Sequence, residues 1–485
     1  MTTRTAAFAA IRWTSMAMIG RSAIALAQIV VLSRLLDPAD FKSVAIAVTI
    51  INVGIVFTDM GLSNAVIRFR DVTSDELVSL FWLNLMLGGG VTFAVAAASP
   101  LIAWFYGDTR LTPLIQMAST VFFITAFGQQ QRSLAEKNLQ FKGLFGIEIL
   151  SALLGFCVAV IMALFGFGAP SIVTGNIANA IGVSGLCWVM LTDGFRPKLT
   201  FRFVTAKRFM SFGLNVVVFQ FFNALALNGD VILGGRLIPG SALGYYFQPR
   251  DLCLRIMFVV NTIVNRVSFP LLASVAHDKP RIKSVYLKAL NMTSSVNFPI
   301  YAFLAVFSSD VIEIVMGPKW GDSISVMRVL ALWCAVRSIG NPVGILLLAT
   351  GETRLATVSA TTVAISLFVF VGLGAQFGIL GIPIALTILY VLLVPIFWAT
   401  LVRPVCGAGF TEYHRVLLLP ALSTVCAAAA EIVVLEFVEG AFARLSLGGA
   451  AGVVAYVGAS WFLNRGWLLS MTELLMVEPV RRRLA

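Results

Sequence analysis

The sequence predicts an all-α integral membrane protein, and its composition, its long apolar runs and its uneven distribution of positive charge all indicate this class. Hydrophobic residues make up 59% of the 485 residues and charged residues 12%, against roughly 25% charged residues in a typical soluble domain. The mean hydropathy is +0.93. Apolar runs longer than about 18 residues recur along the chain, as in transmembrane helices. Together these properties exclude a water-soluble globular fold.

The apolar runs predict about fourteen membrane-spanning helices. Each run begins and ends at polar residues, Gly or Pro. The first run is too long for the apolar core of a cleaved signal peptide. The predicted spans are 14–36, 41–66, 77–103, 112–134, 144–167, 171–192, 208–236, 244–270, 289–313, 323–349, 355–376, 381–400, 416–438 and 447–463. The longest predicted connections, 193–207 and 271–288, are too short for an inserted soluble domain.

Lys and Arg residues are concentrated on alternate connections, and this sets the expected orientation. The richer side includes Arg132 and both termini, whereas the poorer side carries Arg34, Lys42, Arg110, Arg236, Lys319 and Arg444. By the positive-inside rule, both termini are expected in the cytoplasm. This orientation accounts for the formal net charge of +12 without a nucleic-acid partner. The arginines at 481–483 are expected to contact anionic membrane lipids.

Cysteine and histidine usage gives no sign of a metal site. The six cysteines have no CxxC spacing and are expected to act as small hydrophobic residues. His277 and His414 lie in separate polar connections. The sequence has no G-x-x-x-x-G-K-[ST] loop for a nucleotide. We therefore expect no metal, no cofactor and no enzymatic activity.

Three pairs of short segments recur in the same order in both halves of the chain, which predicts an internal repeat. SRLLDPADF at 33–41 resembles GRLIPGSAL at 235–243, YGDTRLTPLIQMA at 106–118 resembles MGPKWGDSISVMRVLA at 316–331, and FG at 167–168 recurs at 377–378. We expect an N-terminal six-helix lobe over 1–200 and a second over 201–400 around a central cavity. Residues 401–485 would add two helices and a basic tail. In the last helix, GGAAG at 448–452 offers small residues for helix packing or dimerisation.

Charged residues inside the predicted spans are the candidate substrate-binding residues, because a charge at the centre of a membrane helix costs about 2.5 to 3.5 kcal/mol and usually faces a protein interior or a water-filled cavity. They are Arg21, Asp230, Arg250, Arg255, Arg328 and Arg337. Arginine presents a fork of donors suited to phosphate. The alternative is internal pairing, for instance of Arg250 with Asp251 or of Arg236 with Asp230, or snorkelling to the interface.

Two of these arginines and two acidic residues receive more specific roles. Arg255 and Arg337 lie deepest in their spans and are the strongest candidates for contact with an anionic substrate. Asp59 and Glu148 lie near the cytoplasmic halves of their spans, where they are candidates for proton coupling. Capping a helix or pairing with a loop is the alternative role for both.

Five segments carry a resemblance to a known family. They are LSRLLDPADFKSVAIA at 32–47, TDMGLSNAVIRFRDVTSDELVSLFWLNLMLG at 58–88, WFYGDTRLTPLIQMAS at 104–119, NGDVILGGRLIPGSALGYYFQPRDL at 228–252 and FPLLASVAHDK at 269–279. On these segments the chain resembles the polysaccharide transporter family of the multidrug/oligosaccharidyl-lipid/polysaccharide exporter superfamily, in its colanic-acid-exporter-like branch. The last two helices contribute little to the resemblance.

The resemblance implies a flippase that moves undecaprenyl-diphosphate-linked oligosaccharide from the cytoplasmic to the periplasmic leaflet of a bacterial inner membrane, by alternating access, for exopolysaccharide or lipopolysaccharide assembly. It implies lipid-linked oligosaccharide, membrane lipids, and the polysaccharide polymerase and export machinery as partners. The alternative is a cation-coupled small-molecule or drug antiporter on the same fold. The first span of such antiporters often carries a carboxylate, and residues 14–36 contain no Asp or Glu.

Overall fold

Helices form all the regular secondary structure in the part of the chain that the structure describes. The structure is a computed structural model and describes residues 3–59, 62, 72–191, 197–198 and 203–469. The helices are α1 (Thr3–Leu35), α2 (Pro38–Gly54), α3 (Val56–Asp59), α5 (Ser74–Tyr106), α6 (Leu111–Lys137), α7 (Phe141–Leu164), α8 (Pro170–Met190), α9 (Phe203–Leu237), α10 (Ala242–Ser274), α11 (Lys279–Val306), α12 (Ser308–Val315), α13 (Ser323–Ser338), α14 (Gly340–Ala349), α15 (Thr353–Gly374), α16 (Gly381–Phe397), α17 (Arg403–Cys406), α18 (Phe410–Phe437) and α19 (Ala441–Leu463).

The prediction of about fourteen membrane spans is confirmed. Thirteen helical segments of the described chain are long and apolar enough to cross a bilayer, and the pair α11 and α12 gives a fourteenth when counted as one span. That pair is bent by 80° at Phe307, a break that the apolar run 289–313 does not reveal. The predicted connection 271–288 is wrong in extent, because the polar residues from Lys279 onward form the first turns of α11.

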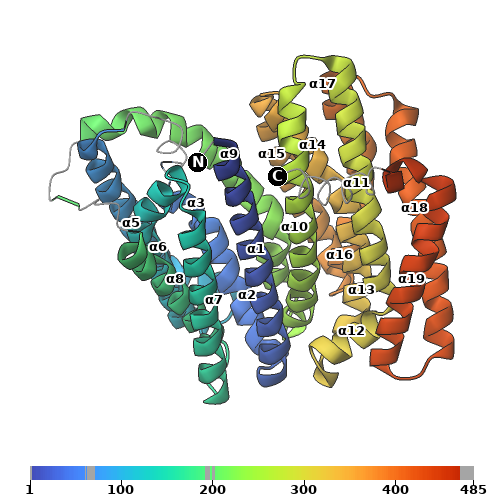
Figure 1. Cartoon of the computed structure of the whole chain (residues 1–485). Helices are drawn as coiled ribbons and strands as arrows, with labels where there is room; N and C mark the ends of the chain where they lie inside the picture. The colour runs from blue at the N-terminus through green and yellow to red at the C-terminus, as the bar shows by residue number, and fades with distance from the viewer. Residues whose placement is uncertain (1–2, 60–61, 63–71, 192–196, 199–202, 470–485) are drawn as a thin grey trace. The chain divides into compact units, whose positions relative to one another are not determined.

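The chain divides into two compact units. Unit 1 comprises residues 1–248 and 359–375, and unit 2 comprises 249–358 and 376–485. In unit 1, α7 packs along both α1 and α8, α6 packs against α5 and α8, and α2 contacts α6 and α9 (Figure 1). In unit 2, α11 packs against α13 and α18, while α18 and α19 form a hairpin. The predicted lobe boundaries at 200 and 400 stay a prediction.

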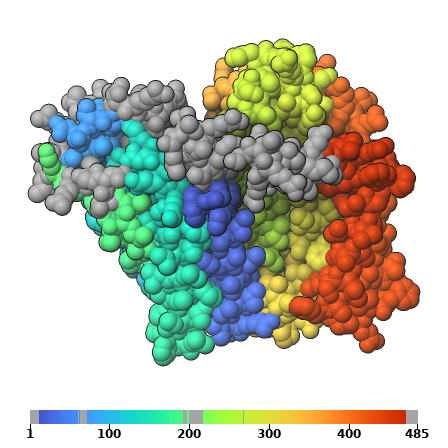
Figure 2. Space-filling model, viewed as in Figure 1, coloured from blue at the N-terminus to red at the C-terminus, as the bar shows by residue number. Residues whose placement is uncertain are grey.

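Large apolar side chains cover the outside of the helices, as expected when lipid is the solvent. The α7 helix lies on the surface of unit 1 in Figure 2, and its exposed side chains include Leu150, Leu154 and Ile161. In unit 2, Phe437 and Phe462 are 81% and 85% exposed. In water such a surface would drive aggregation, so it supports a multi-pass membrane protein.

Local sequence signals set several helix boundaries. Pro38 occupies the first turn of α2, and its fixed φ suits a helix start. Thr73 and Glu76 form a capping box at α5, in which the Thr73 N–H donates to Glu76 Oε2 at 2.9 Å. The same helix ends at Gly107, whose φ of +67° favours glycine. These signals set the start of α2 and both ends of α5, which lie within three residues of the predicted starts at 41 and 77 and of the predicted end at 103.

The residues that follow the repeated segment 235–243 contact its counterpart, 33–41, inside unit 1. Gly244 lies in the first turn of α10 directly against the backbone of Pro38, so that a Cβ built on Gly244 would overlap the Pro38 carbonyl oxygen. Nearby, the amide of Gln248 donates to the hydroxyl of Ser33 at 2.9 Å. The first segment and the residues directly after its counterpart are therefore structural neighbours, and only glycine at 244 permits their close approach.

Replacing Gly244 with Ala is therefore expected to destabilise the protein by about 1 to 3 kcal/mol, because the backbones of α2 and α10 must move apart. Thermal unfolding of detergent-solubilised protein, followed by size-exclusion chromatography, measures this loss. The control is Gly185→Ala on α8, where a Cβ has open space. If the Gly244 variant were as stable as this control, the close contact would be contradicted.

Small residues in the last helix serve packing within unit 2. Gly448 lies against the ring of Phe307 at the bend between α11 and α12, and Gly452 lies against the carboxylate of Glu431 on α18. A Cβ at either position would overlap these side chains. The small residues at 448–452 therefore allow α19 to approach α18 and the α11–α12 bend closely.

Candidate functional site

Charged residues of α1, α6 and α7 meet in unit 1. Arg132 Nη2 lies 2.7 Å from Glu148 Oε1, and Arg21 Nη1 lies 3.6 Å from Glu148 Oε2. Arg132 also contacts Glu136 Oε1 through Nε at 3.1 Å. The Glu148 side chain is only 14% exposed, so its charge is largely removed from solvent and offset by two guanidinium groups. The structure thus brings the predicted residues Arg21 and Glu148 together.

This network lines a cavity of about 310 Å³ bounded by α1, α2, α6, α7 and α8. Apolar side chains such as Val48 and Val183 form part of its wall. The polar and charged lining residues are Arg21, Asn52, Thr125, Gln129, Arg132, Glu148, Asn176, Asn179 and Ser184. We call this space the unit 1 cavity. So much hydrogen-bonding capacity in a membrane bundle indicates a water-filled or ligand-binding space.

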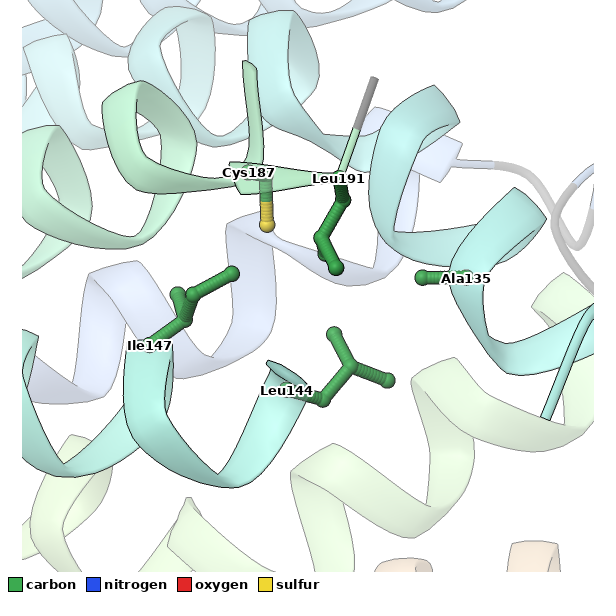
Figure 3. Packing of buried hydrophobic residues seen from close by; sticks show 5 residues of the cluster. All are labelled: Ala135, Leu144, Ile147, Cys187 and Leu191. Atoms are coloured by element: carbon green, nitrogen blue, oxygen red, sulfur yellow. The ribbon is translucent and has the colours of Figure 1, made fainter. Parts of the chain in front are cut away.

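An apolar cluster holds the helices that carry this network. Ala135 of α6, Leu144 and Ile147 of α7, Cys187 of α8 and the following Leu191 pack together, as Figure 3 shows. Ile147 immediately precedes Glu148, and Ala135 follows Arg132 by less than one helical turn. Packing of the cluster therefore fixes where both charged side chains emerge. Cys187 acts here as a small hydrophobic residue, as predicted from the sequence.

Arg337 is the centre of a second cluster, which lies in unit 2. Its Nη1 donates to the hydroxyl of Tyr390 on α16 at 2.8 Å. Its guanidinium carbon lies 5.0 Å from the ring centroid of Trp333 and 5.2 Å from that of Tyr390. Cation–π attraction to both rings fixes the side chain. In the part of the chain that the structure describes, no carboxylate pairs with Arg337, so its positive charge is not neutralised by these residues.

Hydrogen bonds between asparagine side chains connect helices of unit 2. Asn341, one turn after Arg337, exchanges hydrogen bonds of 2.6 and 3.3 Å with Asn265 of α10. On α11, the Asn297 amide donates to Asn261 at 3.4 Å and to the Thr293 carbonyl at 2.9 Å. These bonds tie α10 to α11 and α14 within the membrane.

The remaining predicted arginines occupy different environments. Arg255 is paired with Asp251 through a 2.6 Å contact one turn away on α10. Asp251 is therefore engaged by Arg255, not by Arg250 as the alternative reading suggested. Arg250 itself is 3% exposed, and Arg328 lies on the exposed side of α13.

The predicted acidic residues are also separated. Asp230 is buried on α9 and accepts a 2.5 Å hydrogen bond from the Tyr246 hydroxyl. Its suggested partner Arg236 instead lies over the Phe105 ring. Asp59 ends the short helix α3 and lies outside the unit 1 cavity. Among the described residues, no group of three or more His, Cys, Asp or Glu side chains could hold a metal ion.

Sequence reasoning missed several residues of these clusters. Arg132 was counted with the positive charges of the cytoplasmic side, although it lies near the end of the predicted span 112–134; in the structure it lies within α6 and lines the unit 1 cavity. The spacing of Arg132 and Glu136 by four residues could have indicated a pair on one helical face. Asn176 and Asn179 were missed because neutral amides within an apolar run leave a span prediction unchanged. Tyr390 lies 53 residues from Arg337, and no local pattern connects them.

Several known proteins of polysaccharide biosynthesis are similar in sequence to the chain. A family model described as polysaccharide biosynthesis protein matches residues 31–325. The chain is 28% identical to the lipopolysaccharide biosynthesis protein WzxC of Escherichia coli K12 over 84% of its own length and 83% of that protein. It is 29% identical to the teichuronic acid biosynthesis protein TuaB of Bacillus subtilis 168, over 82% and 83% respectively.

Solved structures of low sequence identity share the fold. An inward closed structure of the lipid II flippase MurJ superposes with a TM-score of 0.73 at 14% identity, covering 94% of this chain and 100% of MurJ. An inward-facing multidrug resistance MATE transporter of the MOP superfamily gives 0.59 at 16% identity, covering 79% of this chain and 96% of the transporter. The predicted fold class, an all-α membrane protein with about fourteen spanning helices, is confirmed, and its fold is like that of MurJ and the MATE transporters.

Proposed function

The chain belongs to the polysaccharide biosynthesis protein family, and on that premise we propose that it is a flippase for undecaprenyl-diphosphate-linked oligosaccharide. It would carry repeat units from the cytoplasmic to the periplasmic leaflet by alternating access, for exopolysaccharide or lipopolysaccharide assembly. The names of WzxC and TuaB, which refer to lipopolysaccharide and teichuronic acid biosynthesis, support this substrate class. So does the fold shared with the lipid II flippase MurJ.

The observation that carries the proposal is the un-neutralised guanidinium of Arg337 in unit 2. A positive charge within a membrane helix is costly unless a partner compensates it, and the described part of the chain supplies no acid. Trp333 and Tyr390 hold the group in place and leave donors available. A diphosphate is a suitable partner, because its oxygens accept the paired N–H bonds that a guanidinium presents. Of the six predicted substrate-binding residues, we therefore propose Arg337 as the main residue that binds the diphosphate.

A cation-coupled antiporter is the alternative, and the fold shared with MATE transporters favours it. Such a protein needs a carboxylate that is free to bind the cation. Glu148, the carboxylate that lines the unit 1 cavity, is engaged by Arg21 and Arg132, and two nearby positive charges oppose cation binding. The described part of α1 contains no Asp or Glu. These observations favour the flippase.

Reconstitution into liposomes tests the proposed function directly. Proteoliposomes containing fluorescent undecaprenyl-diphosphate oligosaccharide are treated with a membrane-impermeant quencher, which reports lipid in the outer leaflet only. We expect exchange between leaflets that depends on the protein. If the lipid does not exchange, but an imposed cation gradient drives export of small amphiphiles, the antiporter is correct and the flippase proposal fails.

We propose a bacterial inner-membrane location with both termini in the cytoplasm, from the positive-inside rule. The polymerase and export machinery would then receive the substrate on the periplasmic side. To test the orientation, single cysteines are placed at His277 and at Asp108 in a variant without native cysteines. An impermeant maleimide should label the Asp108 variant in intact spheroplasts and the His277 variant only after permeabilisation. Labelling in the opposite sense would reverse the proposed topology.

A further inference from the structure

We propose that the unit 1 cavity is a carbohydrate subsite, which binds a sugar ring of the lipid-linked substrate through neutral amide and hydroxyl groups. This inference rests on the proposed function and names where a sugar of the substrate is recognised. It concerns unit 1 alone.

Hydrogen-bonding groups without a protein partner are the first argument. The side chains of Asn52, Thr125, Asn176 and Asn179 line the cavity and make no hydrogen bond with the part of the chain that the structure describes. Each amide offers two N–H donors and one acceptor oxygen, and the hydroxyl offers both functions. Polar side chains within a helical membrane bundle usually bond to neighbouring helices. These four side chains surround one cavity without such bonds, so they can bind a ligand that is rich in hydroxyl groups.

The balance of charge is the second argument. Arg21 and Arg132 contribute two positive charges, and Glu136 and Glu148, which contact them, contribute two negative charges. Their sum is zero. A phosphate group would have to displace Glu148 from Arg132, and a metal cation would be repelled by both guanidinium groups. A neutral polyol meets neither obstacle, and the paired carboxylate and guanidinium groups add acceptors and donors for it.

Size and surroundings are the third argument. A cavity of about 310 Å³ is at the small end of the range for small-molecule sites. It accommodates a sugar ring with its hydroxyl groups, but not a polyprenyl tail. The mixture of polar side chains with apolar ones such as Val48 and Val183 suits the alternating polar and apolar surfaces of a pyranose.

The test compares four lipids that differ only in the sugar. The full-length protein in lipid nanodiscs is titrated with polyprenyl diphosphate carrying glucose, galactose, glucuronic acid or no sugar, and Kd is measured by microscale thermophoresis. We expect at least one sugar-bearing lipid to bind about tenfold more tightly than the bare diphosphate, as expected for a few net hydrogen bonds. In the double variant Asn176→Ala and Asn179→Ala, this preference should fall below about twofold.

Matched variants separate this inference from the proposed function. Gln116→Ala, on α6 outside the cavity lining, should keep the sugar preference. Arg337→Gln tests the proposed function by itself and should weaken binding of the bare polyprenyl diphosphate. Thermal unfolding of each variant checks that the fold is intact. The Asn179→Ala change keeps the Cβ atom of residue 179, which is the atom that lies against Gly155.

Three outcomes would overturn the inference. The wild type could show no sugar preference although the bare lipid binds, or the double variant could keep the preference. The double variant could also weaken all four lipids equally, which would assign the cavity to the diphosphate. The proposed function fails in a different way, when the wild type binds none of the four lipids.

Discussion

Replacing Arg337 with Gln is expected to slow leaflet exchange of lipid-linked oligosaccharide by about 10- to 100-fold. The variant keeps a hydrogen-bond donor, on a shorter side chain, but removes the charge for which the described part of the chain provides no acid. A hydrogen bond to a charged group contributes about 1.5 to 3 kcal/mol, which corresponds to this range of rates if it is lost at the step that limits transport. The liposome quenching assay measures the rate.

Two companion variants define what the arginine does. Arg354→Gln removes the same charge at the exposed start of α15 and should leave exchange unchanged. Tyr390→Phe keeps the ring over the guanidinium but removes the 2.8 Å hydrogen bond, so a loss of only a few-fold is expected. Arg337 would have no role in diphosphate binding if Arg337→Gln and Arg354→Gln exchanged lipid at the same rate.

The helices of this protein could be predicted from sequence because their signals are local. Apolar runs mark the spans, and Asp37 with Pro38, or Thr73 with Glu76, mark the starts. The 80° bend at Phe307 was missed. Phe307 packs against Gly448, which lies far along the chain, and no residue within the apolar run signals the break.

The candidate site was predictable only in part, because a sequence shows which charges enter the membrane but not which of them are paired. Arg255 and Arg337 looked equivalent, yet Asp251 pairs with Arg255 and no described acid pairs with Arg337. Arg21 and Glu148 were chosen for different roles, and the structure brings them together beside Arg132. Counting Arg132 with the charges of the cytoplasmic side concealed this connection, since a residue near a helix end can face either the cytoplasm or a cavity.

Replacing Glu148 with Leu is expected to lower the free energy of unfolding by about 2 to 4 kcal/mol, because removal of one partner leaves Arg132 and Arg21 without compensation. The lower part of this range is favoured by the partial exposure of Arg132 and Arg21, 34% and 54% respectively. Thermal or denaturant unfolding in nanodiscs measures the change. The matched control is Leu150→Ile on the exposed side of the same helix, α7, which should leave the free energy of unfolding unchanged.

A double variant tests whether the charge network, rather than the shape of the side chain, is responsible. Adding Arg132→Met to Glu148→Leu replaces the pair with apolar groups of similar size and should recover more than half of the loss. Leaflet exchange under an imposed pH gradient then distinguishes a structural role of Glu148 from a role in proton coupling. If Glu148 carries protons, the stability of the double variant returns while stimulation by the gradient does not. Stimulation that persists in the double variant would remove Glu148 from the coupling mechanism and leave it the role of neutralising two arginines.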